Sequence, residues 1–369
     1  MAFSLIVLST EYWDSIRQAR KELLYRALLT NRQVDYLAYI EPMCHWWQGQ
    51  SNVKHYRNGA AHIYRWMYPL PGERFYPVLL LNRFLQSLRI SQIFSKNKGN
   101  ITGIIYHPYN WLAAKHVRGV SSWLFDWTDD WGIYHNSDTV AKLQDRSIKR
   151  CDGVIAASTV LYERALSIRR DDRVLFLPNA TALKPPDNLE EPEELVEIDH
   201  PRIGFIGHVG SWIDLDLVKE VAKRIPEYQW CILGYASYSA RKQFISLANI
   251  HFLGIQPYYS LPNWMAFMDV LVAPYNQSAQ EFVSGSSKIY DYFFSGKPIV
   301  SSRMSTAYHF PGLIEIAHQD PEAWEIALEK CLKENDPDLV RRRKKAAAEN
   351  TWEERASVFI KWLQEIVDR

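Results

Sequence analysis

The chain has 369 residues, of which 47% are hydrophobic and 23% are charged, a composition typical of globular proteins. Its 43 basic and 42 acidic residues leave a formal net charge of +1, so no overall basic field indicates a nucleic-acid partner. A chain of this length favours two domains over a single hydrophobic core.

The cysteines and the apolar runs bear on the location of the protein. The cysteines are far apart and lack metal-ligand spacing, which is typical of reduced thiols in the cytosol: Cys44, Cys151, Cys231 and Cys331. No run of about 18 apolar residues occurs, and residues 1–9 lack the basic leader of a signal peptide. We therefore expect a cytoplasmic protein.

The chain begins with a strand, helix, strand pattern. Residues 3–8 and 34–40 are apolar runs of strand length, and residues 14–29 have a helical pattern. No glycine-rich phosphate fingerprint follows the first strand, so this unit is not predicted to bind a dinucleotide. Loops at the carboxyl ends of parallel strands face the ligand, which makes Tyr12 and Trp13 candidates for acceptor contact. A buried hydrophobic anchor is the alternative for Trp13.

Two segments of the chain have surface chemistry that allows more than one interpretation. Residues 42–76 are rich in aromatic and histidine side chains, and alternation over residues 62–68 favours a β-hairpin over an acceptor-binding surface. Residues 79–96 have apolar residues at helical spacing with basic residues on the remaining face. A helix packed in the core is expected there, with contact to an anionic membrane surface as the alternative. The basic run 341–345 allows a solvated helix face or contact with acidic lipid.

Three carboxylates follow the apolar run of residues 121–125. Asp126, Asp129 and Asp130 lie within five positions, so their charges repel and each can raise the pKa of a neighbour. A raised pKa suits a general base, and we predict Asp130 as that base, with Asp129 as the alternative or as a cap of the next helix. A metal site is disfavoured because no other ligands cluster nearby in the sequence.

A second α/β pattern follows a segment rich in proline and acidic residues, residues 183–200, which we predict to connect two domains. The strand at residues 202–206 leads into Gly207-His208-Val209-Gly210 and an amphipathic helix from about residue 215. Such glycines let the backbone approach a phosphate that faces the helix N-terminus. Gly207, His208 and Gly210 are therefore candidate phosphate-binding residues.

The most informative stretch is residues 268–302, which reads as strand, polar loop, short helix and strand. Lys288 and Asp291 share one helix face near its N-terminus, and Ser286 and Ser287 lie at the N-cap, where unsatisfied N–H groups attract anions. A cation and a helix dipole suit a pyrophosphate, and a carboxylate one turn later suits a ribose diol. The alternative is an ordinary βα unit with a solvated Lys–Asp pair.

The segment SSKIYDYFFSGKPIVSS resembles the donor-binding signature P-x-K-x-x-E-Y-x-A-x-G-K-P-V of GT-B glycosyltransferases of group 1, the family 4-like kind. The resemblance implies that Lys288 contacts donor phosphate and that Asp291 holds the ribose hydroxyls. Asp291 is one methylene shorter than the usual glutamate. The position where many relatives have a further glutamate holds Val283, and Glu281 is the nearest acid.

The resemblance extends over nearly the whole chain. The strand followed by D-x-x-D-D-W, and the segment CDGVIAASTVLYERAL, resemble the first domain of bacterial and cyanobacterial exopolysaccharide glycosyltransferases of the teichuronic-acid type. Pro178-Asn179-Ala180 resembles their P-N-G strand end, and Thr351-Trp352 resembles the start of their last helix. By the same resemblance, His208 approaches the β-phosphate or the donor sugar, and the backbone at Ile255 holds the base.

The resemblance implies a GT-B fold, with two Rossmann-like α/β domains that face each other across a cleft. Residues 1–195 form the acceptor side, the last helix at 352–369 crosses back onto it, and residues 200–350 bind the nucleotide-sugar. The donor-binding residues are expected to be Gly207, His208, Gly210, Ile255, Ser286, Ser287, Lys288 and Asp291.

The implied activity is sugar transfer from a UDP-sugar, with UDP-glucose as the first donor to test. The acceptor is expected to be a glycan or a lipid-linked sugar in exopolysaccharide or envelope polysaccharide biosynthesis, met by peripheral contact with the inner membrane face. Neither a metal nor another cofactor is expected.

Two alternative functions remain open, a UDP-sugar 2-epimerase and a non-catalytic nucleotide-sugar-binding subunit. The first half shows no histidine and acid set for epimerase-type hydrolysis beyond the aspartate cluster, while the atypical Asp291 keeps the binding subunit open. The stereochemistry is also open. An inverting path needs a base such as Asp129 or Asp130, whereas a retaining path relies on phosphate and helix dipoles.

Overall fold

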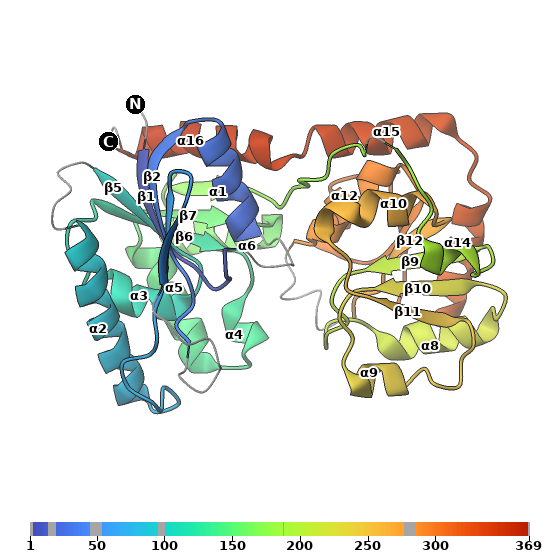
Figure 1. The fold of residues 1–369 in the computed structure, drawn as a ribbon, viewed down its shortest axis with the longest axis horizontal. Helices are drawn as coiled ribbons and strands as arrows, with labels where there is room; N and C mark the ends of the chain where they lie inside the picture. Colours follow the sequence, from blue (N-terminus) through green and yellow to red (C-terminus); the bar gives the residue numbers. More distant parts are fainter. Residues whose placement is uncertain are drawn as a thin grey trace. The chain divides into compact units, whose positions relative to one another are not determined.

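The structure, a computed structural model, describes residues 3–13, 20–44, 54–94, 100–186, 188–276 and 285–367. The chain divides into two compact units, each built on one β-sheet flanked by helices (Figure 1). Unit 1 comprises Met1–Pro178 and Trp352–Arg369, and unit 2 comprises Asn179–Thr351. The C-terminal helix thus belongs to the unit that contains the N-terminus.

Unit 1 has an eight-stranded sheet in the order β3-β4-β2-β1-β5-β6-β7-β8. Its strands are β1 Phe3–Leu8, β2 Val34–Ile40, β3 Lys54–Asn58, β4 Ala61–Arg65, β5 Ile101–Ile105, β6 Ser122–Trp127, β7 Gly153–Ala156 and β8 Val174–Phe176. The neighbouring strands of this sheet pair in parallel, apart from the antiparallel hairpin of β3 and β4. The order reverses between β1 and β5, which places a topological switch point at their carboxyl ends.

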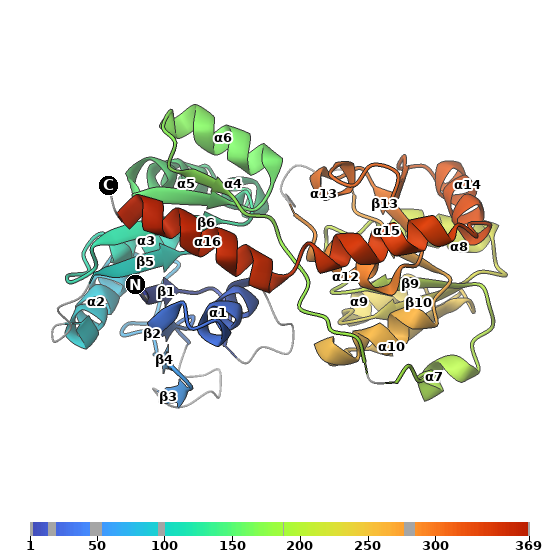
Figure 2. The ribbon, with the colours of Figure 1, turned by 90° about the horizontal axis from the view of Figure 1, so that it is seen from above.

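The helices of unit 1 cover this sheet and are α1 Arg20–Thr30, α2 Tyr76–Phe94, α3 Pro108–Ala114, α4 Trp131–Tyr134, α5 Asp138–Arg150, α6 Thr159–Arg169 and α16 Trp352–Val367. Figure 2 shows α16 lying across unit 1 beside α1. Trp352 is buried at the start of α16, with the Arg20 guanidinium 5.7 Å from its ring centroid. This packing confirms that the last helix returns to the first unit.

Unit 2 has a six-stranded parallel sheet in the order β11-β10-β9-β12-β13-β14. Its strands are β9 Arg202–Ile206, β10 Gln229–Leu233, β11 Ile250–Gly254, β12 Val270–Ala273, β13 Ile299–Ser302 and β14 Glu315–Ala317. Its helices are α7 Glu193–Val196, α8 Leu215–Arg224, α9 Tyr238–Lys242, the 3-10 turn η2 Tyr258–Ser260, α10 Leu261–Ala266, α12 Ser287–Ser295, α13 Ser305–Tyr308, α14 Pro321–Leu332 and α15 Pro337–Ala348. The strand order reverses between β9 and β12, so ligands are expected at the carboxyl ends of these two strands.

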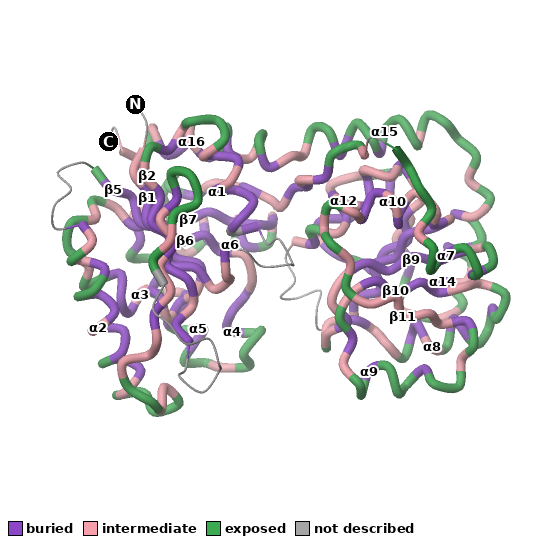
Figure 3. Tube along the Cα trace, viewed as in Figure 1, coloured by how far each residue is buried: buried purple, intermediate pink, exposed green. Residues whose placement is uncertain are grey.

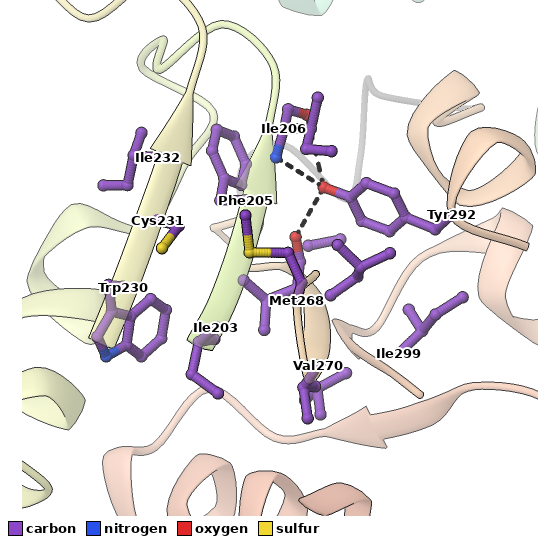
Figure 4. Close-up of a cluster of buried hydrophobic side chains, with 14 of the residues drawn as sticks. Ile203, Phe205, Ile206, Trp230, Cys231, Ile232, Met268, Val270, Tyr292 and Ile299 are labelled. Atoms are coloured by element: carbon purple, nitrogen blue, oxygen red, sulfur yellow. Dashed lines mark hydrogen bonds between the residues drawn. The ribbon is translucent and has the colours of Figure 1, made fainter. Parts of the chain in front are cut away.

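A buried tyrosine fixes helix α12 against this switch point (Figure 4). The Tyr292 hydroxyl accepts from the backbone N–H of Ile206 at 3.0 Å and donates to the carbonyl of Val272 at 3.1 Å. These two contacts tie one turn of α12 to β9 and β12 together. The rotation of α12, and with it the side on which Lys288 and Asp291 lie, follows from this anchor.

The segment 183–200 is not the interdomain connection that the sequence predicts. Leu183, Leu195 and Ile198 join the hydrophobic core of unit 2, and the Arg202 guanidinium donates to the carbonyls of Leu195 and Ile198. The Thr181 N–H donates to the Asn350 carbonyl at 3.0 Å. The division of the chain therefore lies at Pro178 instead of near residue 195, because a few well-spaced apolar residues are enough to dock a polar segment.

Other expectations are met in part. The hairpin predicted within residues 42–76 is present as β3 and β4, while His45, Trp46 and Trp47 lie outside the described residues. Strand β6 continues to Trp127 instead of ending at residue 125. Among the helices in the described part of the chain, none combines the length and apolar character that crossing a membrane requires.

Candidate functional site

The loop after β9 meets the start of α12 at the switch point of unit 2. Gly207 has a φ of +139°, and a Cβ at this position would lie 2.2 Å from Cε of Lys288. Only glycine allows both this backbone conformation and this approach. The Lys288 Nζ donates to the Tyr275 hydroxyl at 3.0 Å and lies 5.5 Å from the ring centroid of Phe205. A half-buried ammonium group is thus held at the carboxyl ends of β9 and β12.

The N-terminus of α12 lies next to this ammonium group. Ser286 is the N-cap residue, but its side chain does not cap the helix; its Oγ forms a hydrogen bond of 3.1 Å with the Tyr275 hydroxyl instead. Its N–H donates to Thr306 Oγ1 at 3.2 Å, and Ser287, the first helical residue, is exposed. The first-turn N–H groups and the helix dipole therefore face the same place as Lys288, a combination that attracts anions.

Asp291, one turn further along α12, is half-buried and partly satisfied. Its Oδ1 accepts hydrogen bonds from Thr181 Oγ1 and from the Tyr258 hydroxyl, each at 2.7 Å. Its Oδ2 takes no hydrogen bond from any residue that the structure describes. Burial raises the pKa of this carboxyl group to about 7, while the two hydroxyls and Lys288 oppose the rise. Oδ2 can accept from a ligand hydroxyl.

The other predicted donor residues lie along the same edge of the sheet. His208 lies between the rings of Trp212 and Tyr235, at centroid distances of 5.1 and 5.3 Å. A Cβ at Gly210 would lie 2.6 Å from the Trp212 ring, so a larger residue would displace that ring. Ile255 follows β11 and is 54% exposed. The structure thus brings all of the predicted donor residues to the carboxyl edge of one sheet.

Several residues of this site lie outside the predicted donor set. Tyr275 links Lys288 to Ser286, and Thr181 supports Asp291 from 110 positions away. Asn179 Nδ2 donates to the Gly285 carbonyl at 2.7 Å, just before α12. The P-N motif at residues 178–179 was the available signal for Asn179 and Thr181. No local pattern connects that motif to α12. Glu281 and Val283 lie outside the described residues.

The aspartates of unit 1 do not form the repulsive cluster that the sequence predicts. Asp126 lies within β6, fully buried, and accepts two hydrogen bonds from the Arg20 guanidinium. Asp130 is 3% exposed and forms an ion pair with Arg164 through Oδ2. Each of these two carboxylates therefore has its own cation. Arg20 and Arg164 lie 106 and 34 residues away from these aspartates, so the spacing of residues within the loop could not predict the two pairs.

Asp130 is also the N-cap of α4, a role that the sequence allowed for Asp129. Its Oδ1 accepts from the N–H of Gly132 at 3.1 Å and from the Gln144 side-chain amide at 3.1 Å. Both oxygens of Asp130 are therefore engaged within unit 1. Asp129, which precedes it, is half-buried at the end of the same loop.

The two predicted acceptor-side aromatic residues differ in exposure. Trp13 is 1% exposed, packs edge-on against Tyr39 at a centroid distance of 4.9 Å, and lies under the Arg26 guanidinium. Trp13 is therefore the buried anchor, and its predicted acceptor contact does not fit this burial. Tyr12 is half-buried, with the Arg65 guanidinium 4.7 Å from its ring centroid.

A histidine pair that was not selected from the sequence lies at the carboxyl edge of unit 1. His107 follows β5, and its Nε2 lies 3.1 Å from Nε2 of His135. Because Nδ1 of His107 accepts from the N–H of Tyr109, its Nε2 carries the proton and donates to His135. The ring of Trp131, the residue after Asp130, lies 4.6 Å from His107. This edge therefore combines carboxylates, imidazoles and aromatic rings.

A cavity of about 930 Å³ lies at the opposite, amino-terminal edge of the unit 2 sheet, with His200, Asp269 and Lys297 in its wall. It contains none of the predicted donor residues. Within the described ranges, no group of three or more histidine, cysteine, aspartate or glutamate side chains is arranged to hold a metal ion.

Comparison with known proteins identifies a relative of similar sequence. The chain is 24% identical over 228 residues to a protein of Bacillus subtilis (strain 168) assigned to teichuronic acid biosynthesis as the glycosyltransferase TuaH. The match covers 56% of this chain and 55% of TuaH, so the chain spans about half the length of this curated relative. No protein-family model matches the chain.

Solved structures share the architecture of the whole chain. Sucrose-phosphate synthase from Thermosynechococcus elongatus superposes with a TM-score of 0.77 at 15% identity, over 99% of both chains. Anabaena HepE, solved in complex with UDP and glucose, superposes with a TM-score of 0.68 at 13% identity, over 99% of this chain and 98% of that one. The fold of this protein is the GT-B fold.

Proposed function

We propose that the protein is a glycosyltransferase that takes its sugar from a UDP-sugar, with UDP-glucose as the first donor to test. One observation carries this proposal. A half-buried lysine, the N-terminus of a helix, and a carboxylate with one available oxygen lie in sequence along α12 at the switch point of unit 2. The glycosyltransferase TuaH and HepE, solved with UDP and glucose, support the choice of reaction and nucleotide.

Each part of the donor has a matching group in this arrangement. The Lys288 ammonium and the first-turn N–H groups of α12 bind the pyrophosphate, which Gly207 allows to approach the backbone closely. Asp291 Oδ2 accepts hydrogen bonds from the ribose diol. The backbone at Ile255 holds the base, and His208 lies beside the β-phosphate and the sugar. In the transfer step, the bond from the anomeric carbon to the phosphate oxygen breaks while an acceptor hydroxyl oxygen bonds to that carbon. Lys288 stabilises the charge that develops on the departing UDP.

We assign the acceptor side to the carboxyl edge of unit 1, with Tyr12, Asp129 and Asp130. In an inverting reaction a carboxylate takes the proton of the acceptor hydroxyl. Asp130 is poorly suited to this step because both of its oxygens are engaged, one of them by Arg164. We propose Asp129, the less buried of the two, as the base and Asp130 as a positioning residue that fixes the loop. In a retaining reaction the proton of the acceptor hydroxyl goes to the departing phosphate oxygen, so neither carboxylate needs to take it.

The proposed acceptor is a glycan or a lipid-linked sugar of an exopolysaccharide or envelope polysaccharide. This choice is supported by the assignment of TuaH to teichuronic acid biosynthesis. A cytoplasmic enzyme meets a lipid-linked acceptor at the inner face of the membrane, which makes peripheral membrane contact part of the same proposal.

The test is a panel of UDP-sugars with purified protein, read by UDP release in the presence and absence of a glycan acceptor pool. We expect release from one UDP-sugar to rise with acceptor, and to be lost in Lys288→Ala. A free epimerised sugar without transfer would identify a UDP-sugar 2-epimerase. Nucleotide-sugar binding without turnover under any acceptor would identify a binding subunit. Either result would overturn the proposal.

A further inference from the structure

Helix α2 of unit 1 exposes a continuous apolar face. Tyr76, Leu80, Phe84 and Leu88 recur every four residues on this face, and Leu81 lies beside Leu80. Each of the five side chains is between 38% and 47% exposed. Figure 3 shows the trace of α2 alternating between exposed and buried segments. Single exposed apolar residues are common on protein surfaces, but five on one face of one helix indicate an interaction site.

The opposite face of α2 packs in the core, as the sequence predicts for the whole helix. Leu79, Ile90 and Phe94 are buried, and Arg83 is 9% exposed in an ion pair with Glu73. Arg83 is one of the basic residues of segment 79–96 that were expected on the face opposite its apolar residues, and it is instead inward. The apolar residues of α2 therefore divide between the core and a second face that the described chain leaves uncovered.

Exposed basic residues lie on α2 and in the segments that adjoin it: Arg74, Arg89, Lys115, His116 and Arg118. The Arg74 guanidinium lies 5.1 Å from the Phe75 ring centroid, and the His116 ring lies edge-on to Phe84 at 5.6 Å. The Arg118 N–H donates to Ser91 Oγ on α2 at 2.9 Å. Along its 19 residues, α2 contains no aspartate or glutamate. Basic residues thus lie just before α2, on the helix itself, and in the segment after α3 that contacts it.

The basic run of α15 shows that a group of basic residues does not by itself indicate an interaction site. Arg341 pairs with Asp338, Arg343 with Glu334, and Lys345 with Glu349. In contrast, the arginines and the lysine around the apolar face of α2 form no ion pair with any described residue. The solvated helix face that was expected for residues 341–345 fits the exposed Arg341 and Lys345 but not Arg343, which is 2% exposed. Helix α2 differs from α15 in both charge balance and apolar exposure.

We propose that α2 docks unit 1 on a membrane surface that contains anionic lipid. The helix, about 28 Å long at 1.5 Å per residue, lies in the plane of the membrane with its rings and leucines at the acyl boundary. The surrounding arginines and lysine contact lipid phosphates. A second copy of the chain fits less well, because a symmetric contact would place these cations opposite one another. The inference deepens the peripheral membrane contact of the proposed function and rests on it in that respect, but it uses no residue of the donor site.

The test is flotation of the full-length protein with vesicles of phosphatidylcholine alone or of phosphatidylcholine and phosphatidylglycerol in a two-to-one ratio. We expect binding to the anionic vesicles only, reduced at high salt because the cations are screened. Phe84→Glu should lower the bound fraction by about tenfold, since a charge is placed at the acyl boundary. Its matched control is Ile245→Glu in unit 2, where the isoleucine is 86% exposed and lies far from α2 in sequence.

A second pair of variants tests the charges. Arg89→Glu with Arg118→Glu should abolish binding to anionic vesicles, whereas Arg341→Glu with Lys345→Glu should leave it unchanged. Equal binding to neutral vesicles, or unchanged binding of Phe84→Glu, would overturn the proposal. A dimer in light scattering that Phe84→Glu dissociates would assign the face to a second copy instead. UDP-glucose titration of the same variants should match wild type, so this test and the test of donor use can fail separately.

Discussion

Two aspartates at the carboxyl edges of the two sheets have opposite surroundings. Asp130 in unit 1 has both oxygens bonded by its own unit, through the cap of α4, Gln144 and Arg164. Asp291 in unit 2 has one oxygen bonded by two hydroxyls, an available second oxygen, and a pKa that burial raises to about 7. A carboxylate whose oxygens are both engaged, one by an arginine, stabilises a loop. A carboxyl group with one oxygen available for hydrogen bonding and a pKa of about 7 is suited to bind a ligand hydroxyl.

The two sites differ for a physical reason. In unit 1, an arginine from α6 compensates the charge of Asp130 at contact distance. In unit 2, the described residues around Asp291 contribute hydroxyl groups, and the nearby cation, Lys288, is directed to Tyr275. Hydroxyls satisfy an oxygen without supplying a charge, so desolvation outweighs them and the carboxyl group holds its proton more tightly.

The largest effect is expected at the acceptor side. Asp129→Asn should lower turnover by roughly 10²–10⁴-fold if this residue is the base of an inverting reaction. The affinity for UDP-glucose should not change, because the proposed nucleotide-binding residues all belong to unit 2. Steady-state turnover and calorimetric titration, both on folded protein, measure the two quantities.

Asp130→Asn is the matched variant for Asp129→Asn. It should lower the free energy of unfolding by about 1–3 kcal/mol, because a buried carboxylate loses its charge-assisted contact with Arg164, which keeps Asp145 as its second partner. Thermal unfolding measures this loss. Turnover close to wild type in both asparagine variants would remove the base and favour a retaining reaction.

Lys288→Ala should weaken UDP binding by roughly ten- to a hundredfold, since a charge-assisted contact contributes about 1.5–3 kcal/mol. Titration calorimetry with UDP measures the loss. Lys297→Ala is the control, because Lys297 follows the same helix at its other end and lies in the wall of the amino-edge cavity. Unchanged UDP affinity in Lys288→Ala would show that α12 does not hold the pyrophosphate.

Asp291→Asn should remove a pH dependence of donor binding. In the empty protein the raised pKa keeps this carboxyl group largely protonated below about pH 7. A ribose diol favours the ionised form, so the affinity for UDP-glucose should rise by about tenfold between pH 6 and 8. UDP-glucose is the suitable probe because its pyrophosphate diester does not titrate in this range. A wild-type affinity that is flat with pH would contradict the assignment.

The same pKa predicts a stability effect of definite sign. Because the pKa of Asp291 is higher in the folded protein than its ordinary value of 3.8, the folded state holds the proton more tightly between these values. Stability of the unliganded protein should therefore fall as pH rises toward 7, and Asp291→Asn should lack this loss.

Asp291→Ala should also weaken UDP binding more than binding of 2′-deoxy-UDP. Equal losses for both nucleotides would point to a role in folding.

The smallest effect is expected for Tyr275→Phe, which removes the hydroxyl that joins Lys288 to Ser286. The Lys288 ammonium donates to this hydroxyl. Its loss leaves the charge in place but less firmly positioned, so UDP affinity should fall about two- to tenfold, less than in Lys288→Ala. Tyr238→Phe, at a tyrosine that is 82% exposed in the same unit, is the control. A loss as large as that of Lys288→Ala would show that Tyr275 itself contacts the donor.

The sequence alone determined the features that depend on neighbouring residues. Apolar runs predicted the central strands β1, β2, β9 and β12, because parallel strands are buried on both faces. The Gly207 loop follows one predicted strand, and the helix with Lys288 and Asp291 follows a later one. Because the carboxyl ends of parallel strands face one side, this order predicted which edge of the second sheet could hold a nucleotide.

Only the tertiary structure decided which side chains complete these groups and which faces stay exposed. Thr181 and Arg164 lie 110 and 34 residues from the aspartates they contact, and no local periodicity reports such pairs. The periodicity of α2 likewise predicts an amphipathic helix, but its apolar residues span more of the surface than the core can cover. Which part of that surface is buried depends on the neighbouring elements, and these are brought together only when the chain folds.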